Sequence, residues 1–144
     1  MKLVEIYQRL KDNLQGLVER GEWGPRITGA YQPLEYAWEP FQDFLELMHG
    51  GAKAVLFLGM NPGPHGMAQT GVPFGSVSIV REWFQIAKEV KQPFNAHPAL
   101  SIDGFLHKKQ EVSGQRFWGL MRQRFGSVQF FFHAHAVHSF CPLL

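Results

Sequence analysis

The sequence predicts an α/β protein with parallel strands, and three features support this prediction. A short apolar run at 53–58 lies between glycines, as strands buried in a parallel sheet do. A loop rich in glycine and proline follows it, and an amphipathic segment begins at Ser76. A second apolar run occupies 128–132. The order strand, glycine-rich loop, helix and strand is typical of βαβ units, in which ligands bind at the carboxyl ends of the strands.

The composition is that of one folded domain, 1–144, because 45% of the residues are hydrophobic and 14% are aromatic. The single cysteine, Cys141, rules out an internal disulfide. The first residues are charged and helical in pattern, without the apolar core of a signal peptide. We therefore expect an intracellular protein. No apolar run approaches the roughly 18 residues that span a bilayer, so no membrane partner is expected.

Helices are expected before the first strand. Apolar residues recur at helical spacing from Leu3 to Leu17, and Gly21 is placed to end this helix. A second helix is expected to begin near Pro40, since proline is tolerated in a first helical turn. The run 53–58 then forms the first strand, which we expect to be buried.

The second half of the chain is expected to contain two helices and a loop. Ser76 is a suitable N-cap for a helix that runs to Val90. The segment 92–114 has the character of an exposed loop. A further helix, capped by Ser113, is expected to end at Gly126, directly before the second strand.

The loop after the first strand is rigid and almost uncharged. The sequence VLFLGMNPGPHGMAQTGVPFG at 55–75 contains five glycines, three prolines and one asparagine, with no acid and no lysine. It fits neither the P-loop nor the dinucleotide fingerprint, and its prolines lack amide donors for a phosphate. The prolines fix the backbone around Asn61, whose amide could position a water or a planar group. Because Phe74 suits stacking on a ring, we interpret the loop as one side of a nucleobase slot.

The segment GMNPGPHGMAQTGVPFG at 59–75 closely resembles the first active-site motif of the single-strand-selective monofunctional uracil-DNA glycosylases, within the uracil-DNA glycosylase superfamily. Segments similar to others of that family follow in the same order: YQPLEYAWEP at 31–40, EVSGQRFW at 111–118 and VHSFCPLL at 137–144. The resemblance implies a three-layer α/β/α sandwich with a central parallel sheet. This chain would contain the N-terminal part of that domain, truncated after the second strand.

The resemblance also implies hydrolysis of the N-glycosidic bond of uracil and oxidised pyrimidines in DNA, with the base flipped into a pocket. Asn61 would position the attacking water. Met60 and Gly63 would shape the pocket beside it, and Phe74 would stack on the base. Because asparagine is no general base at neutral pH, the water would be oriented rather than strongly activated.

The expected partner is therefore DNA that contains uracil or damaged pyrimidines, single- or double-stranded, and the protein is expected to act as a monomer. The motif contains no lysine to form a Schiff base, which agrees with a monofunctional enzyme rather than a lyase. Neither a cofactor nor a metal is expected. The expected location is the nucleus in a eukaryotic cell and the cytoplasm in a bacterium.

The chain departs from the family in two places. Ser139 replaces the asparagine that reads the uracil edge, and a hydroxyl cannot present the paired donor and acceptor of an amide. Base discrimination is therefore expected to be weaker or altered. The sequence also stops at Leu144, before the family's HPSPRN-like motif, whose histidine stabilises the leaving base. We therefore expect the C-terminal portion of the domain to be missing, and a catalytically inactive nucleic-acid-binding remnant stays open as an alternative.

Positive charge is concentrated in the second half of the chain. Between Lys88 and Arg124 there are seven lysines or arginines and only three acids. We expect Lys108, Lys109 and Arg116 to contact DNA phosphates, which would give salt-sensitive binding that is independent of sequence.

The histidines suggest another alternative. HAHAVH at 133–138 is close to the HxHxDH pattern of metallo-β-lactamase-type hydrolases, and imidazoles are good zinc ligands. However, Val137 occupies the place of the aspartate. We favour strand-end histidines that bond to nearby backbone or solvent, with His133 and His135 on one strand face, over a metal-dependent hydrolase. Cys141 is expected to be a buried structural thiol.

Overall fold

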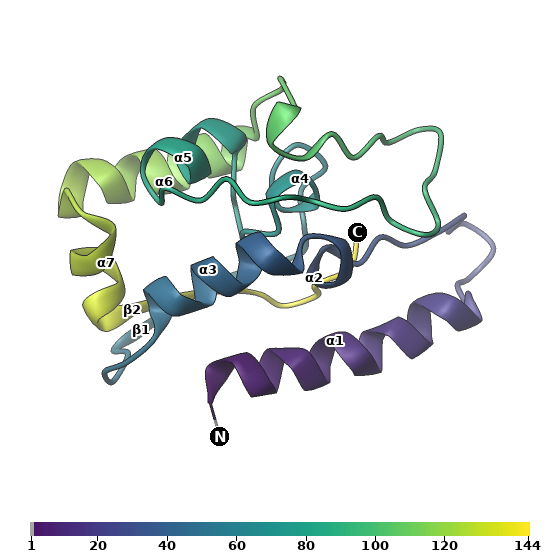
Figure 1. The fold of residues 1–144 in the computed structure, drawn as a ribbon, viewed down its shortest axis with the longest axis horizontal. Coiled ribbons are helices and arrows are strands. Elements are labelled where there is room, and N and C mark those ends of the chain that lie inside the picture. Colours follow the sequence, from purple (N-terminus) through teal and green to yellow (C-terminus); the bar gives the residue numbers. More distant parts are fainter. Residues whose placement is uncertain (1) are drawn as a thin grey trace.

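The structure is a computed structural model that describes residues 2–144. In chain order it contains α1 (Leu3–Arg20), α2 (Pro33–Tyr36), α3 (Trp38–Met48), β1 (Val55–Gly59), α4 (Met67–Thr70), α5 (Val77–Glu82), the 3₁₀ helix η1 (Gly104–Leu106), α6 (Val112–Phe125), α7 (Val128–Ala134) and β2 (His135–Ser139) (Figure 1). Among these residues no helix is both long and apolar enough to cross a membrane.

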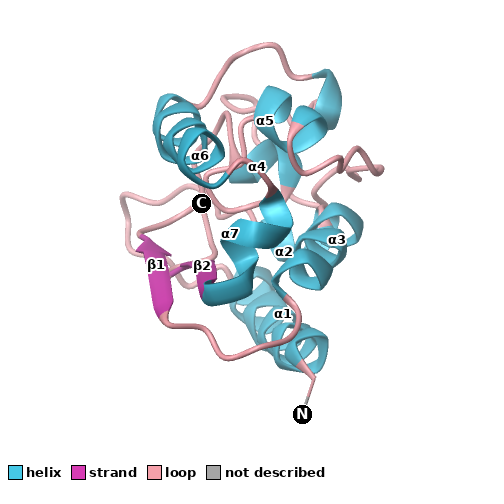
Figure 2. Cartoon of the chain, turned by 90° about the vertical axis from the view of Figure 1, so that its left-hand side faces the viewer, coloured by secondary structure: helices cyan, strands magenta, loops and turns pink. Residues whose placement is uncertain are grey.

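Within the described residues the sheet consists of β1 and β2, which pair in parallel. Val55 lies opposite His135, and Gly59 lies opposite Ser139. Figure 2 shows the two strands together at one side of the molecule, with β1 outermost. The predicted α/β class and the parallel pairing are confirmed, and four α-helices and the 3₁₀ helix η1 lie between the two strands in the sequence.

The prediction of a second strand at 128–132 is wrong, because these residues belong to α7 and the strand begins only at His135. Ser127 caps the helix by accepting a hydrogen bond from the Phe130 amide (3.2 Å). The buried residues Val128, Phe131 and Phe132 stand at i, i+3 and i+4, which places them on one helical face. The same spacing excludes the expected strand position of His133, which lies in the helix and is exposed.

The prediction that the first strand is buried is also wrong. Val55, Leu56 and Leu58 of β1 are 41%, 59% and 54% exposed. Only Phe57 and Gly59 face the packed interior, where the Phe57 ring lies 5.1 Å from the Phe117 ring of α6. β1 is therefore an edge strand whose other face is apolar and open to solvent.

β2 is better covered than β1, because helices contact both of its faces. The His135 ring stacks on Phe131 of α7, with ring centroids 4.9 Å apart. Three residues further on, the other face carries His138, whose Nδ1 lies 2.7 Å from the Tyr7 hydroxyl of α1. Burial of the imidazole lowers the pKa of His138 below its ordinary value.

The helix expected from Ser76 to Val90 is much shorter in the structure. α5 ends at Glu82, and Gln85 then takes a positive φ of 59°, which the α-helical conformation does not allow. The chain beyond it runs as a long extended loop toward η1 (Figure 1). The expected exposed loop at 92–114 is partly correct, although it contains η1, the buried Ile102 and the start of α6.

The other predicted helices are confirmed. α1 extends from Leu3 to Arg20 and ends at Gly21, which has a φ of 60°. α3 begins two residues before Pro40, so the proline lies in its first turn. α6 ends at Gly126, with a φ of 72°, but its N-cap residue is Glu111 and not Ser113.

Aromatic side chains form the core between α3, α5, α6 and α7. Trp118 is fully buried, and its ring lies 4.8 Å from that of Phe84 and 5.5 Å from that of Phe131. Phe44 of α3 contacts Phe132 at 5.5 Å. The Trp118 indole also donates to the carbonyl of Pro73, which holds α6 against the loop that follows β1 and positions the site described next.

Candidate active site

The carboxyl ends of β1 and β2 lie on the same side of the molecule, because the strands are parallel. Their pairing continues past the strands, because the amides of Phe140 and Cys141 donate to the carbonyls of Gly59 and Met60, both at 2.8 Å. Leu144 is held in turn by two backbone hydrogen bonds with Tyr31, at 2.7 and 3.0 Å. The loop after β1 and the segment after β2 therefore lie side by side and form two adjacent walls of a cavity.

A cavity of about 330 Å³ lies between these walls and the start of α6. It is lined by Gly59, Asn61, Pro62, Gly63, Pro64, Phe74, Glu111, Ser113, Ser139 and Leu144. We call it the Asn61 cavity. Four of the predicted site residues meet in it, namely Asn61, Gly63, Phe74 and Ser139. The first and last of these are far apart in sequence, and the parallel pairing of β1 with β2 brings them together.

The Asn61 amide is oriented by its own loop. Its Nδ2 donates to the carbonyl of Pro62 at 3.2 Å. Pro62 is buried, and the next residue, Gly63, packs directly against the Glu111 carboxylate. The side chain of Asn61 thus projects from a backbone held by prolines and by contact with α6, as positioning of a small molecule requires.

Phe74 lines the Asn61 cavity. Its ring packs so closely on Gly59 that a Cβ added there would lie 2.7 Å from Cζ, and its centroid is 4.9 Å from that of Phe117. Its backbone has a positive φ of 56°, a conformation that costs a non-glycine residue about 1–3 kcal/mol. Hydrogen bonds hold this strained turn, including one of 3.0 Å from the Trp118 indole to the carbonyl of Pro73.

Glu111 is the site residue that sequence reasoning missed. Its carboxylate accepts hydrogen bonds from the backbone amide of His65 (3.3 Å) and from the Ser113 hydroxyl (3.1 Å). It also packs on Gly63 and Gly66, where an added Cβ would overlap it. It is the one carboxylate side chain among the described residues that line the Asn61 cavity. The sequence signal for Glu111 was its place at the start of the EVSG segment, directly before an expected helix.

Ser139 is buried, with 4% of its surface exposed, and its hydroxyl donates to the sulfur of Met67 at 3.3 Å. The hydroxyl proton is therefore directed to a weak acceptor, the sulfur of the buried Met67, which is not among the lining residues. A longer amide at this position would extend further into the cavity and would offer both a donor and an acceptor.

The other predicted site residues lie outside the Asn61 cavity. Met60 is 79% exposed and is not among the lining residues. Lys108 and Lys109 line a second, larger space beside the loop, and Arg116 is exposed on α6.

The metal-site alternative gains no support from the geometry. His133 lies in α7, whereas His135 and His138 lie on opposite faces of β2. His135 Nδ1 is 2.8 Å from the carbonyl of Phe131. Within residues 2–144, no group of three histidine, cysteine or acidic side chains is arranged to hold a metal ion. The expectation for Cys141 is wrong, because the thiol is exposed beyond the end of β2.

Fold and site together define an α/β protein with a small ligand cavity at the carboxyl ends of two parallel strands. No family model matches the chain. The chain is similar to curated proteins named single-strand selective monofunctional uracil-DNA glycosylase. It is 46% identical to the one from Bos taurus over 136 residues, which are 94% of this chain and 48% of that protein. Over 114 residues, 79% of this chain and 41% of each relative, it is 51% identical to the Rattus norvegicus protein and 50% identical to the Mus musculus protein.

The chain therefore spans about half the length of the curated relatives that it matches. The resemblance to the single-strand-selective monofunctional uracil-DNA glycosylases, first inferred from the motif after β1, is confirmed over most of this chain.

Proposed function

We propose that the chain acts in base excision repair as a monofunctional uracil-DNA glycosylase, which hydrolyses the N-glycosidic bond between uracil and deoxyribose. The observation that carries this proposal is the meeting of Asn61, Phe74 and Ser139 around one cavity of about 330 Å³. The similarity to proteins named for this activity supports it. A flipped pyrimidine is a flat group with polar edges, and enzymes that act on a base must extract it from the stack.

In this mechanism the base enters the Asn61 cavity and lies on the Phe74 ring. Asn61 hydrogen-bonds to a water on the sugar side and holds it in line with the bond that breaks. Since an amide is a very weak base, the bond to uracil is largely broken before the water attacks, and the sugar becomes cation-like. The negative charge of Glu111 lies in the wall of the same cavity and favours positive charge on the sugar.

The wider substrate range belongs to the same proposal. The substrate is DNA, single- or double-stranded, that contains uracil or damaged pyrimidines, including oxidised ones, and the protein acts as a monomer. Lys108 and Lys109, on the segment before α6, and Arg116, on α6 itself, are exposed cations and supply phosphate contacts. The proposed location is intracellular, in the nucleus of a eukaryotic cell or the cytoplasm of a bacterium. The contact of β2 with helices on both faces supports a three-layer sandwich.

A second function, binding to damaged DNA without turnover, is favoured by one specific observation. The Ser139 hydroxyl donates to the Met67 sulfur, so it does not offer the uracil edge the two hydrogen bonds of an amide. A cavity of this kind would hold a flipped base or an abasic site while it discriminates poorly among bases.

The test is single-turnover release of uracil from a labelled single-stranded oligonucleotide by the 144-residue chain, with binding measured separately. Asn61→Ala should lower the release rate by about 100-fold or more, because it removes the group that positions the water. Its effect on binding should stay within about twofold, since phosphate contacts dominate affinity. Asn13→Ala, at an exposed position of α1, is the matched control and should behave like the unchanged chain.

The outcomes separate the two functions. Release that Asn61→Ala abolishes supports the glycosylase. Binding to uracil-containing DNA with no release by the unchanged chain supports the second function, and the absence of both release and binding overturns both.

A further inference from the structure

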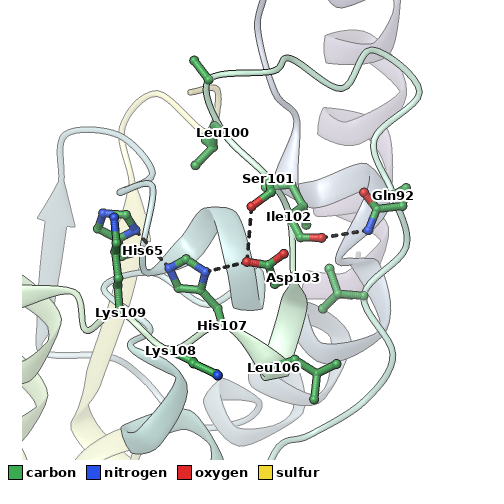
Figure 3. A pocket seen from close by; sticks show the side chains of 12 residues that line it. His65, Gln92, Leu100, Ser101, Ile102, Asp103, Leu106, His107, Lys108 and Lys109 are labelled. Carbon is green, nitrogen blue, oxygen red and sulfur yellow. Dashed lines mark hydrogen bonds and ion pairs between the residues drawn. The ribbon is translucent and has the colours of Figure 1, made fainter.

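A second space lies beside the loop that follows β1, with a volume of about 790 Å³ (Figure 3). We call it the His107 cleft. The side chains that give it its chemistry are those of His65, Ser101, Asp103, His107, Lys108 and Lys109. The same loop contributes to both spaces, because Pro64 lines the Asn61 cavity and the next residue, His65, lines the cleft.

The acidic and imidazole groups of the cleft form a hydrogen-bonded relay (Figure 3). Asp103 Oδ2 lies 3.0 Å from His107 Nδ1, and it also accepts from the Ser101 hydroxyl at 3.3 Å. His107 Nε2 lies 3.0 Å from His65 Nδ1, and the two imidazole planes differ by 15°. The relay thus runs from Asp103 through His107 to His65.

The relay is held by a buried scaffold. Gln69 is fully buried, and its Nε2 donates to the carbonyls of Pro64 (3.0 Å) and Ser101 (2.9 Å). Its Oε1 accepts from the backbone amide of Asp103 at 2.9 Å. One side chain therefore connects the loop that carries His65 to the segment that carries Asp103. This arrangement makes the cleft a built site rather than a chance meeting of surface side chains.

The positions of the protons follow from the partners. The hydrogen bond from His107 holds the pKa of Asp103 below its ordinary value, so this carboxyl is ionised at neutral pH and accepts only. His107 Nδ1 therefore carries a hydrogen, and in the neutral ring Nε2 is an acceptor. His65 Nδ1 must then donate, which leaves a lone pair on His65 Nε2. An added proton binds at that nitrogen, where Asp103 stabilises the resulting charge through His107.

Several charged groups decide which ligand the cleft attracts. Lys108 and Lys109 are cations on its rim, and they oppose protonation of the relay while the cleft is empty. Asp103 favours protonation of the relay through its contact with His107. Glu111 also favours it, because its carboxylate accepts a hydrogen bond from the backbone amide of His65. An anion bound near His65 would favour protonation of the relay, because it neutralises the charge of the two lysines and stabilises a proton on His65 Nε2. Binding of an anion and uptake of a proton are then linked.

We infer that the His107 cleft binds a backbone phosphodiester of the DNA strand and takes up a proton on the His65–His107 pair as it does so. This inference rests on the proposed function, because it places the backbone of a strand whose base occupies the Asn61 cavity beside His65, the residue next to Pro64 of that cavity. Two lysines and one protonatable imidazole match a phosphate group, which accepts several charge-assisted hydrogen bonds. DNA binding therefore tightens as the pH falls, unlike binding by lysine or arginine alone.

The test is the affinity of the full chain for a short labelled single-stranded oligonucleotide without uracil, measured by fluorescence anisotropy between about pH 8 and pH 6, the range around the ordinary histidine pKa. The affinity of the unchanged chain should rise roughly threefold to tenfold across this range. His65→Gln and Asp103→Asn should each reduce the rise to less than about twofold. His49→Gln, at an exposed histidine at the end of α3, should leave it intact.

Because the oligonucleotide contains no uracil, the result is independent of base release, and the two proposals can fail separately. Far-ultraviolet circular dichroism verifies that each variant is folded, and Asp103→Asn replaces His65→Gln if the latter unfolds. An unchanged pH dependence in both variants overturns the inference. Inorganic phosphate is the competitor that separates the two possible sources of the anion. Equal competition by phosphate at the same concentration of phosphate groups would overturn the assignment to a DNA strand.

Discussion

The Asn61 cavity and the His107 cleft are lined by two consecutive residues of one loop, Pro64 and His65, yet they are built from different groups. The walls of the cavity are mainly backbone, glycine, proline and a phenyl ring, with Glu111 as its one ionisable side chain among the described lining residues. The cleft is lined by five titratable side chains. The proposals therefore assign a neutral planar group to the first and a charged group to the second. Changes in the cavity should therefore alter base release, whereas changes in the cleft should alter binding and its pH dependence.

The sharpest way to test this division is Gly63→Ala. A Cβ at Gly63 would overlap the Glu111 carboxylate, so this carboxylate would have to shift away from the loop and from the His65 amide that it accepts from. Since a displacement of 1 Å can cost about 100-fold in rate, we expect uracil release to fall by roughly 10- to 100-fold while DNA binding changes less than about twofold. Single-turnover release and anisotropy measure the two effects.

Gly119→Ala is the matched control for this change. Gly119 lies in α6 with open space around its added Cβ, so the substitution should leave release unchanged. An equal loss of binding and release in Gly63→Ala would contradict the separation of the two sites.

A smaller effect, in the opposite direction, is expected at Ser139. Ser139→Asn would offer the base a paired donor and acceptor in place of a hydroxyl that bonds to Met67. Each gained hydrogen bond is worth about 0.5–1.5 kcal/mol, so uracil release at subsaturating DNA should rise about threefold to tenfold. Ser139→Ala removes the hydroxyl and adds no amide, and it should give no such gain. A lower or unchanged rate in Ser139→Asn would show that this position does not read the base.

The smallest effect is expected where Tyr7 of α1 meets His138 of β2, whose side chain lies on the strand face opposite that of Ser139. Burial lowers the pKa of His138, so the unfolded chain binds this proton more readily than the folded chain. The stabilising contribution is complete above the unfolded value, about pH 6.5, and is lost as the pH falls toward the folded value.

The change that tests this effect is His138→Gln, which should make the free energy of unfolding less dependent on pH between about pH 7 and pH 5. Urea unfolding at several pH values measures this dependence. Uracil release should not acquire a new pH dependence, and a change there would connect this interface to the sites.

Several parts of the fold were predictable from local patterns. Gly21 and Gly126 end α1 and α6 at positive φ, as glycines after helical runs do. The motif after β1 located Asn61, Gly63 and Phe74 at one cavity because motif and strand end adjoin in sequence. Ser139 could be placed beside them because the carboxyl ends of parallel strands lie at the same edge of the sheet.

The misses have physical reasons. Three phenylalanines at 130–132 suit a buried strand as well as a helix, and the spacing of Val128, Phe131 and Phe132 together with the cap at Ser127 decides for the helix. The relay of the His107 cleft was hidden, because a fully buried Gln69 brings together residues about 40 positions apart in the chain. Glu111 was hidden for the same reason, since its role depends on contact with two distant glycines.

The exposure of Cys141 gives an experimental advantage. It is the only cysteine in the sequence, and its backbone amide bonds to the carbonyl of Met60, directly before Asn61. A maleimide dye would therefore attach at one known position near the rim of the Asn61 cavity, without any engineered mutation. Quenching of that dye by DNA bases would report the arrival of the strand in real time, as a signal separate from the release of the base.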